Sequence, residues 1–502
     1  MKINFKKFFV AYIFAISFFT SKSQELFDAL SFAELPIQGT ARSMSMSGAF
    51  GALGGEPTCM ITNPAGLGIY RSCEATLTLN NNFSQHNTSS TRNSNNHFTL
   101  GQASYVHAIL LNKKVLIASN FAISFNRLKN FQNKYSLTNE ASSSIINYMA
   151  NQANGISENA FLETNEPYNN SQIGWLSALG YDNYLIKSSG LKQWEPMNNA
   201  KVASNYKYVE TGGIDEFNIS YGVNLAHLFY LGASVGVQTI EKSVTSFYSE
   251  KFHSLDEEEL QMKNKVVFSG VGCNLKLGVI ARPISFLRLG FAYHTPTIYV
   301  ISQHSITEME SRNVLDEKGN RVDVSSSTGE GVDNYQLKTP SRFLFSTAFI
   351  IKKKALVDID YELVDYRTML YADEFSTENF SNENRIIKNF AKINHTLKVG
   401  GEYRVLDFLS LRLGGAFATP VIEPNTMKTL PENSIRTDLE SIVKSWSYNV
   451  SGGIGFRWTY WGIDLAYQYN QQYATLAPIA GVKPVNLTNS YHNILLTGSF
   501  RF

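Results

Sequence analysis

Four basic residues, Lys276, Arg288, Lys398 and Arg412, lie at the polar positions of stretches in which apolar and polar residues alternate. An ammonium or guanidinium group there could bind a carboxylate through charge-assisted hydrogen bonds. Carboxylates occupy equivalent positions at Asp358, Asp360, Glu362, Glu402 and Asp464. The pattern therefore leaves two roles open for the four cations: contact with an anionic ligand, or pairing with these carboxylates.

Residue types that often perform catalysis show no convincing pattern. His294, His395 and His492 lack the spacing of metal ligands, and the chain contains no His-Glu-x-x-His sequence. Cys59 and Cys73 could pair in an exported protein or remain two thiols, and neither case indicates a metal site. We therefore expect no catalytic residues, no metal and no cofactor.

The elements that must position the charged residues are strands with two unlike faces. Over 461–470, apolar and aromatic residues occupy the odd positions, whereas small and polar residues occupy the even ones. This period of two is typical of a half-buried strand. It predicts fourteen strands, at 75–83, 98–106, 114–126, 216–226, 230–241, 273–281, 286–294, 341–351, 354–364, 395–404, 408–417, 446–457, 461–470 and 492–502.

The connections between these strands alternate in length. Short links, such as 227–229, 352–353 and 458–460, alternate with long ones at 127–215, 242–272, 295–340, 365–394 and 418–445. Short turns at one end and long loops at the other are typical of an outer-membrane barrel. A soluble sandwich or propeller is the alternative, but strands of about ten residues exceed the globular average. We expect an all-β, 14-stranded antiparallel transmembrane β-barrel over 75–502, with 127–215 as its longest loop.

The N-terminus carries the signature of export. Three lysines precede an apolar run at 8–19 and a small-residue site at 21–23, which predicts a signal peptide over 1–23. Residues 24–74 then precede the first strand and are small, apolar and poor in charge. Because a barrel of this size cannot fill its own lumen, we expect this segment to form a hatch that plugs it. The net charge of +2 gives no reason to expect a nucleic-acid partner.

Several motifs resemble the FadL/TodX family of outer-membrane transporters for hydrophobic compounds. They are GTARSMSMSGAFGALGGEPTCMITNPAGLG at 39–68, LGVIARPISFLRLGFAYHTPT at 277–297, DIDYELVDY at 358–366 and the closing aromatic strand. The resemblance implies a fourteen-stranded barrel with an N-terminal hatch and passive diffusion of long-chain fatty acids or aromatic hydrocarbons. It also implies that Asn63, Pro64, Ala65 and Gly66 form the hatch motif, near a kinked strand through which ligand leaves sideways.

These observations together predict a channel in the outer membrane of a Gram-negative cell. The expected partners are a fatty-acid-like ligand, outer-membrane lipid or lipopolysaccharide, and the barrel-assembly machinery. A general porin or a surface binding barrel, including a hemin-binding receptor, is the alternative. A Ser/His site in the barrel wall is the enzymatic alternative. An energised receptor would need about 22 strands, which a chain of 502 residues cannot supply.

Overall fold

The computed structural model describes residues 25–502 except 112, 163–166, 171, 253–257, 353, 374–379, 432 and 480–481, so the predicted signal peptide lies outside the described residues. The chain forms a closed antiparallel barrel of fourteen wall strands, which confirms the predicted fold class. The wall strands are β1 (Glu74–Asn87), β2 (Arg92–Leu110), β3 (Leu116–Asn130), β7 (Val202–Leu225), β8 (Phe229–Phe252), β9 (Glu259–Ile284), β10 (Leu287–His294), β14 (Arg342–Ile351), β15 (Ala355–Asp365), β17 (Ile393–Leu406), β18 (Leu409–Ala418), β19 (Ser441–Arg457), β20 (Trp461–Ala477) and β21 (Val485–Arg501). The barrel closes where β1 pairs with β21, with Thr78 opposite Thr497.

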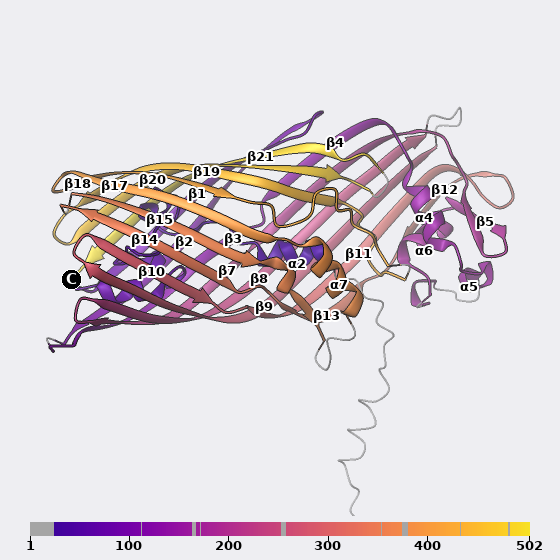
Figure 1. Ribbon diagram of the computed structural model, residues 1–502. Coiled ribbons are helices and arrows are strands. Elements are labelled where there is room, and N and C mark those ends of the chain that lie inside the picture. The colour runs from indigo at the N-terminus through magenta and orange to yellow at the C-terminus, as the bar shows by residue number, and fades with distance from the viewer. Residues whose placement is uncertain are drawn as a thin grey trace, which may run out of the picture.

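The two ends of the barrel differ (Figure 1). The proximal end carries the short turns and the C-terminus, whereas the distal end carries most of the long connections and a helical cap. The distal elements are β4 (Asn133–Ser142), α4 (Ile145–Ala153), α5 (Glu158–Leu162), η3 (Pro167–Asn169), α6 (Trp175–Asp182), β5 (Ile186–Gly190), β6 (Gln193–Pro196), β11 (Ile298–Leu315), β12 (Arg321–Ser327), β13 (Gly331–Lys338), η4 (Tyr366–Thr368), β16 (Leu370–Ala372) and α7 (Ser381–Phe390). No helix within the described ranges combines the length and apolar character needed to cross a membrane.

The wall strands direct apolar side chains outward and polar ones inward. On β7, Phe217 and Ile219 are 58% and 60% exposed, whereas Asn218 between them is 2% exposed. Exposed aromatic residues lie at the ends of wall strands: Trp458 and Trp461 flank the turn between β19 and β20, and Phe502 follows β21. The outer surface therefore has the chemistry of a surface that faces hydrocarbon.

The prediction of a long loop at 242–272 is wrong, because β8 and β9 continue as strands beyond the band of outward-facing apolar side chains, which we call the apolar belt. On β8 most apolar residues face outward up to Val237, but from Ile240 onward most face inward, as at Val244 and Tyr248, with Phe247 as an outward-facing exception. The face of the strand that carries most apolar side chains therefore changes from the outer to the inner one where the strand leaves the belt. An alternation pattern that requires the apolar residues to stay on one face ends at that point. The region 295–340, also expected to be a loop, contains β11, β12 and β13.

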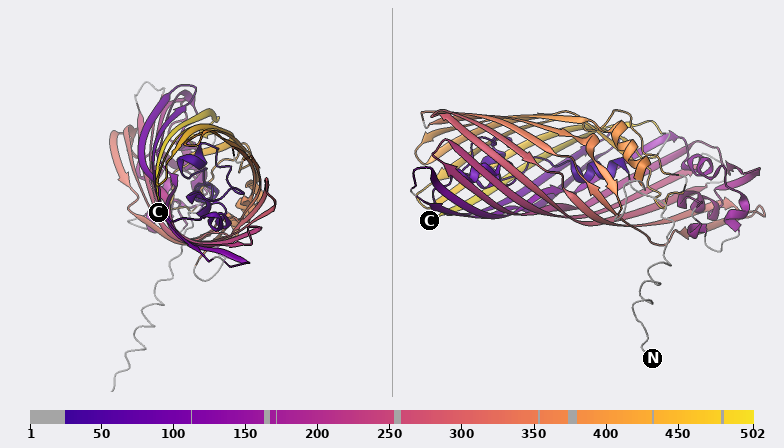
Figure 2. Two further views of the ribbon diagram at one scale, coloured as in Figure 1. Left: turned by 90° about the vertical axis from the view of Figure 1, so that its left-hand side faces the viewer. Right: turned by 60° about the horizontal axis from the view of Figure 1, so that its bottom comes forward.

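Residues 25–73 lie inside the ring of strands (Figure 2). We call them the lumenal segment. It contains α2 (Leu26–Ala33), α3 (Ala41–Met44), and the 3-10 helices η1 (Pro57–Met60) and η2 (Pro64–Ile69). The side chain of Thr40 caps α3 by accepting from the amide of Ser43, and Asn63 caps η2 by accepting from the amide of Ala65. Proline directly after each 3-10 cap suits the first turn, where no amide donor is needed.

Two large apolar cores lie along the barrel axis. One fills the distal cap and joins α4 and α6 to the inner face of β7, β8 and β9. The other surrounds α2 and includes Phe32, Phe131, Phe268, Tyr299 and Tyr371. Smaller clusters join the remainder of the lumenal segment to the wall. The lumenal segment is thus packed against the barrel on either side of residues 34–38.

Candidate functional site

A cavity of about 350 Å³ lies between the lumenal segment and the wall. The segment contributes an apolar edge at Leu35, Pro36 and Ile37, whereas the wall contributes amides and charged side chains, including Asn80, Lys276 and Lys398. Both sides are mixed, because the segment also contributes Glu34 and Gln38 and the wall also contributes Leu344 and Phe417. Such a lining suits an amphipathic molecule with one polar end.

The predicted hatch motif packs tightly against wall glycines. The Asn63 side chain donates to the carbonyl of Gly51 at 2.7 Å and accepts from the amide of Ala65 at 3.2 Å. A Cβ added to Gly232 of β8 would lie 2.2 Å from the Pro64 carbonyl oxygen, and one on Gly278 of β9 would lie 2.0 Å from Asn63 Oδ1. The two wall glycines are therefore required for this contact. Gly66 contacts Cys59 from within the segment, and Cys59, Cys73 and Cys273 are free thiols.

Two carboxylates of β15 hold the glycine-rich part of the segment. Asp360 accepts from the backbone amides of Phe50 and Gly51, both at 3.0 Å, and Asp358 accepts from the amide of Ala52 at 3.4 Å. Both carboxylates are fully buried. Because buried amides need acceptors, these bonds fix the backbone of the segment without any contribution from its side chains.

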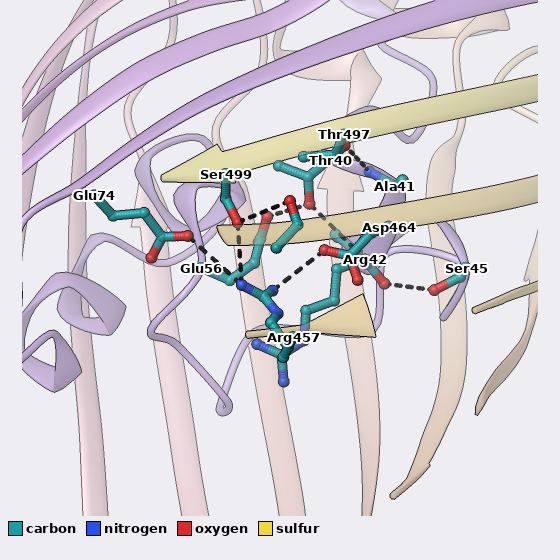
Figure 3. Close-up of polar contacts among 12 residues, drawn as sticks. Thr40, Ala41, Arg42, Ser45, Glu56, Glu74, Arg457, Asp464, Thr497 and Ser499 are labelled. Carbon is teal, nitrogen blue, oxygen red and sulfur yellow. Dashed lines mark hydrogen bonds and ion pairs between the residues drawn. The ribbon is translucent and has the colours of Figure 1, made fainter. Parts of the chain in front are cut away.

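A chain of charged groups fixes the segment near the proximal end (Figure 3). Arg42 donates to Glu402 at 2.9 Å, and Glu402 also accepts from Arg412, which in turn contacts Asp464 at 2.7 Å. Arg457 extends the chain from Asp464 at 3.2 Å. Ala41 donates its amide to Thr497 at 2.8 Å beside this network. Glu56 is buried against the hydroxyls of Thr40 and Thr58, and its burial raises its pKa.

The four cations predicted as ligand contacts all face the lumen, in two different settings. Lys276 and Lys398 line the cavity, and each also contacts a carboxylate at 2.7 Å: Glu216 for Lys276 and Glu362 for Lys398. Arg412 belongs to the proximal charge network and Arg288 donates to the carbonyl of Leu53, and neither lines the cavity. The geometry therefore separates two residues that adjoin open space from two that hold the segment.

A second group of buried charges, which the sequence analysis missed, fixes α2 near the distal end. Asp28 of α2 contacts Arg436 at 2.9 Å, and Glu25 contacts Lys428 at 2.9 Å. Asp438 binds both cations, and its pKa is lowered: the attraction of Arg436 and Lys428 outweighs the effect of burial. Burial raises the pKa of Glu25 to about 8 despite the attraction of Lys428. We call these residues, with Glu440, the distal charge cluster; they are distant in sequence, so no local signal could have identified them.

The wall is incompletely paired on one side of the cavity. The register of β2 with β3 ends at Gln102 and Asn126, beyond which residues 92–101 of β2 pair with β1 alone. Side chains bridge the resulting seam: Asn93 donates to the Ser136 hydroxyl at 2.9 Å and Asn95 donates to the Gln132 carbonyl at 3.2 Å. Residues 128–130 and 132 line both the seam and the cavity. The seam is therefore the place where the lumen is separated from the outside by side chains alone.

One Gly-x-Ser-x-Gly sequence occurs at 232–236, in the middle of β8. Ser234 is buried and bonds to Ser220 at 2.7 Å and to Asn218 at 3.2 Å. A nucleophile elbow needs a sharp turn between a strand and a helix, whereas this stretch is an uninterrupted strand. The motif is therefore structural here. Within the part of the chain that the structure describes, no three His, Cys, Asp or Glu residues are arranged to hold a metal ion.

The fold and the site together define a closed β-barrel whose lumen is occupied by its own N-terminal segment. No family model matches the sequence, and no curated protein matches it. Among solved structures, a Pseudomonas aeruginosa FadL homologue has a TM-score of 0.51 at 12% identity, covering 93% of this chain and 99% of its own. A deltaS2 mutant of the TodX monoaromatic hydrocarbon channel has a TM-score of 0.50 at 12% identity, covering 92% of this chain and 98% of its own. The similarity confirms that the barrel has the fold of these channels.

Proposed function

We propose that this protein is an outer-membrane channel for passive uptake of small hydrophobic compounds, with residues 24–74 acting as a hatch. The observation that carries the proposal is the cavity between the lumenal segment and the seam, inside a barrel whose outer face is apolar. The fold similarity to a channel for monoaromatic hydrocarbons supports this class of solute. The distal end, which carries most of the long connections, then faces the cell exterior, and the proximal end, which carries the short turns, faces the periplasm. A solute would enter at the distal end, reach the cavity when α2 shifts, and move on as affinity falls along the path.

For a fatty acid, we propose Lys398 and Lys276 as the groups that receive the carboxylate. Both ammonium groups border the cavity, and among the described residues each forms an ion pair with one carboxylate at 2.7 Å. Lys276 also donates to the side-chain oxygens of Asn218 and Asn274, which a ligand carboxylate would have to replace. A charge-assisted hydrogen bond contributes about 1.5–3 kcal/mol, which corresponds to roughly a tenfold to hundredfold change in affinity. The carboxylate would thus favour a fatty acid over an alkane of the same length.

The test compares myristate with toluene in proteoliposomes. Lys398→Met keeps the length of the side chain and should weaken myristate binding at least tenfold, with toluene uptake unchanged. Arg404→Met, at an exposed position near the proximal end, is the matched control. Unchanged myristate binding in Lys398→Met and Lys276→Met would exclude the two lysines. Steady conductance of the native protein in planar bilayers would instead favour the general porin.

Release through the seam is the proposed final step, because side chains alone close the wall there. Asn93→Cys with Ser136→Cys should allow a disulfide across the seam, since the native side chains are in contact at 2.9 Å. Oxidation should stop release into the bilayer, and reduction should restore it. A cross-linked protein that still transports toluene at the native rate would place the exit at the proximal end instead.

A further inference from the structure

Beyond the apolar belt, β4, β7, β8, β9, β11 and β12 form one six-stranded sheet that supports the distal cap (Figure 1). A groove of about 880 Å³ crosses all six strands. Its floor follows one register row, which runs from Leu137 through Tyr206, Tyr248 and Met262 to Met309. These five side chains are buried in the core of the cap, so the groove itself lies on the opposite, outer face.

The outward-facing residues on either side of this floor form two rows. The first row is Ser136, Lys207, Phe247, Lys263, Glu308 and Ser327. The second row is Thr138, Asn205, Ser249, Gln261, Glu310 and Ser325. At a strand spacing of about 4.8 Å, six strands give a groove roughly 24 Å long. Hydroxyl, amide and charged side chains in these two rows surround one aromatic ring, that of Phe247.

We propose that this transverse groove binds an acidic oligosaccharide on the outer face of the cell. The inference rests on the proposed orientation, in which the distal end lies outside the membrane. Phe247 is 40% exposed at the centre of the groove and offers a flat apolar face for a sugar ring. Asn205, Ser249 and Gln261 lie beside it and can bond to sugar hydroxyls.

The charges around the groove indicate that the acidic group of the bound oligosaccharide lies next to Lys207. Glu308 holds Lys263 at 2.9 Å, and Arg312 neutralises Glu310 at 2.9 Å. Lys207 lies over the Phe247 ring, 5.6 Å from its centroid, and contacts no carboxylate among the ion pairs of the described residues. An acidic sugar stacked on Phe247 would therefore place its carboxylate within reach of an ammonium that no protein carboxylate holds.

The backbone of the sheet argues against other occupants. The strands that cross the middle of the groove, β7, β8, β9 and β11, are each paired on both sides at this level, so an added peptide strand could join only the outer edges of β4 or β12 and could not lie along the groove. A hydrocarbon would leave the lining hydroxyl, amide and charged groups without partners. The occupant must be recognised by polar side chains and one ring, which is the chemistry of a saccharide.

The test measures binding of hexagalacturonate, with maltohexaose as the neutral probe, to the full detergent-solubilised chain by calorimetry. We expect the acidic probe to bind at least tenfold more tightly. Phe247→Ala and Lys207→Ala should each weaken it at least tenfold. Lys265→Ala is the matched control, because Lys265 is exposed on β9 but does not line the groove. Myristate binding should remain unchanged in all three variants, which shows that they are folded and separates this test from that of the proposed function.

Four outcomes would overturn the proposal. The first is equal affinity of the native protein for the two probes, and the second is native affinity of Phe247→Ala for hexagalacturonate. The third is a loss of hexagalacturonate affinity in Lys265→Ala as large as that in Phe247→Ala and Lys207→Ala. The fourth is a native dimer that Phe247→Ala dissociates. The last outcome would assign the groove to a second copy of the chain.

Discussion

Gly232→Ala tests whether the lumenal segment is a hatch held by its close contact with β8. The added Cβ would lie 2.2 Å from the carbonyl carbon and oxygen of Pro64, whereas ordinary contacts are 3.4–4 Å. The segment must therefore move away by more than about 1 Å, because β8 is fixed by its neighbours β7 and β9. Such overpacking costs about 1–3 kcal/mol. If displacement of the segment relieves the clash, the displaced population should rise roughly 5- to 150-fold.

The native thiol of Cys59 reports this displacement. Cys59 lies in η1, is 1% exposed, and burial raises the pKa of its thiol, so both access and reactivity are low in the docked segment. In a Cys73→Ser, Cys273→Ser background, maleimide labelling of Cys59 should accelerate in Gly232→Ala by the same 5- to 150-fold factor. Toluene entry into proteoliposomes should rise in the same direction.

Gly498→Ala is the control, since an added Cβ there has nothing within 4 Å. Its labelling rate should equal that of the background protein. A folded Gly232→Ala protein with an unchanged labelling rate would refute the reasoning, because the clash would then have been relieved within the wall.

Two further predictions concern the other anchors of the segment. Arg42→Met removes the guanidinium that lies 2.9 Å from Glu402. Loss of a partly buried ion pair should accelerate Cys59 labelling roughly tenfold. A labelling rate unchanged from the background protein would show that the segment stays docked without the Arg42–Glu402 pair. Burial places the pKa of Glu25 at about 8, above its ordinary 4.5, so its stabilisation of α2 is complete below about pH 4.5 and is lost as the pH rises through about 8. The hydrogen-exchange protection of 26–33, after correction for the intrinsic pH dependence of amide exchange, should therefore be lower at pH 9 than at pH 6, and Glu25→Gln should abolish most of this difference.

The wall of the barrel could be predicted because its physics is local. Each of the fourteen predicted strands overlaps one wall strand and extends beyond it by two residues at most, since lipid on one side and a polar lumen on the other impose a period of two over about ten residues. The extensions of β8 and β9 were missed because the hydrophobic phase reverses near Ile240, where the outside changes from hydrocarbon to water. A search that allowed one phase reversal in each strand would have found them.

The candidate site likewise contains a part that local alternation predicts and a part that depends on contacts between distant residues. Lys276 and Lys398 could be assigned to the lumen from alternation alone, but which cations adjoin the cavity depends on where the segment packs. The distal charge cluster joins Glu25 and Asp28 to residues some 400 positions later. Only the closure of the barrel brings these groups together, so no spacing in the sequence records their contact.

The anchors of the segment differ in kind, and this difference predicts an order of release. The motif end is held by steric contact with Gly232 and by backbone amides bonded to Asp360. The α2 end is held by a buried cluster that includes Glu25 and Glu440, whose pKa values burial raises to about 8 and about 7. Ionisation of both would leave four carboxylates facing two cations, Lys428 and Arg436.

We therefore expect α2 to release first and to open the distal side of the cavity while the motif stays docked. At pH 9, hydrogen exchange over 26–33, corrected for the intrinsic rate of a free amide at that pH, should accelerate, while the labelling of Cys59, corrected for the reactivity of a free thiol, stays at its pH 6 rate. Gly232→Ala at pH 6 should instead accelerate the labelling of Cys59 relative to the background protein, while hydrogen exchange over 26–33 stays unchanged. If each perturbation accelerates both signals equally, the segment moves as one body, and the cavity opens at both ends together.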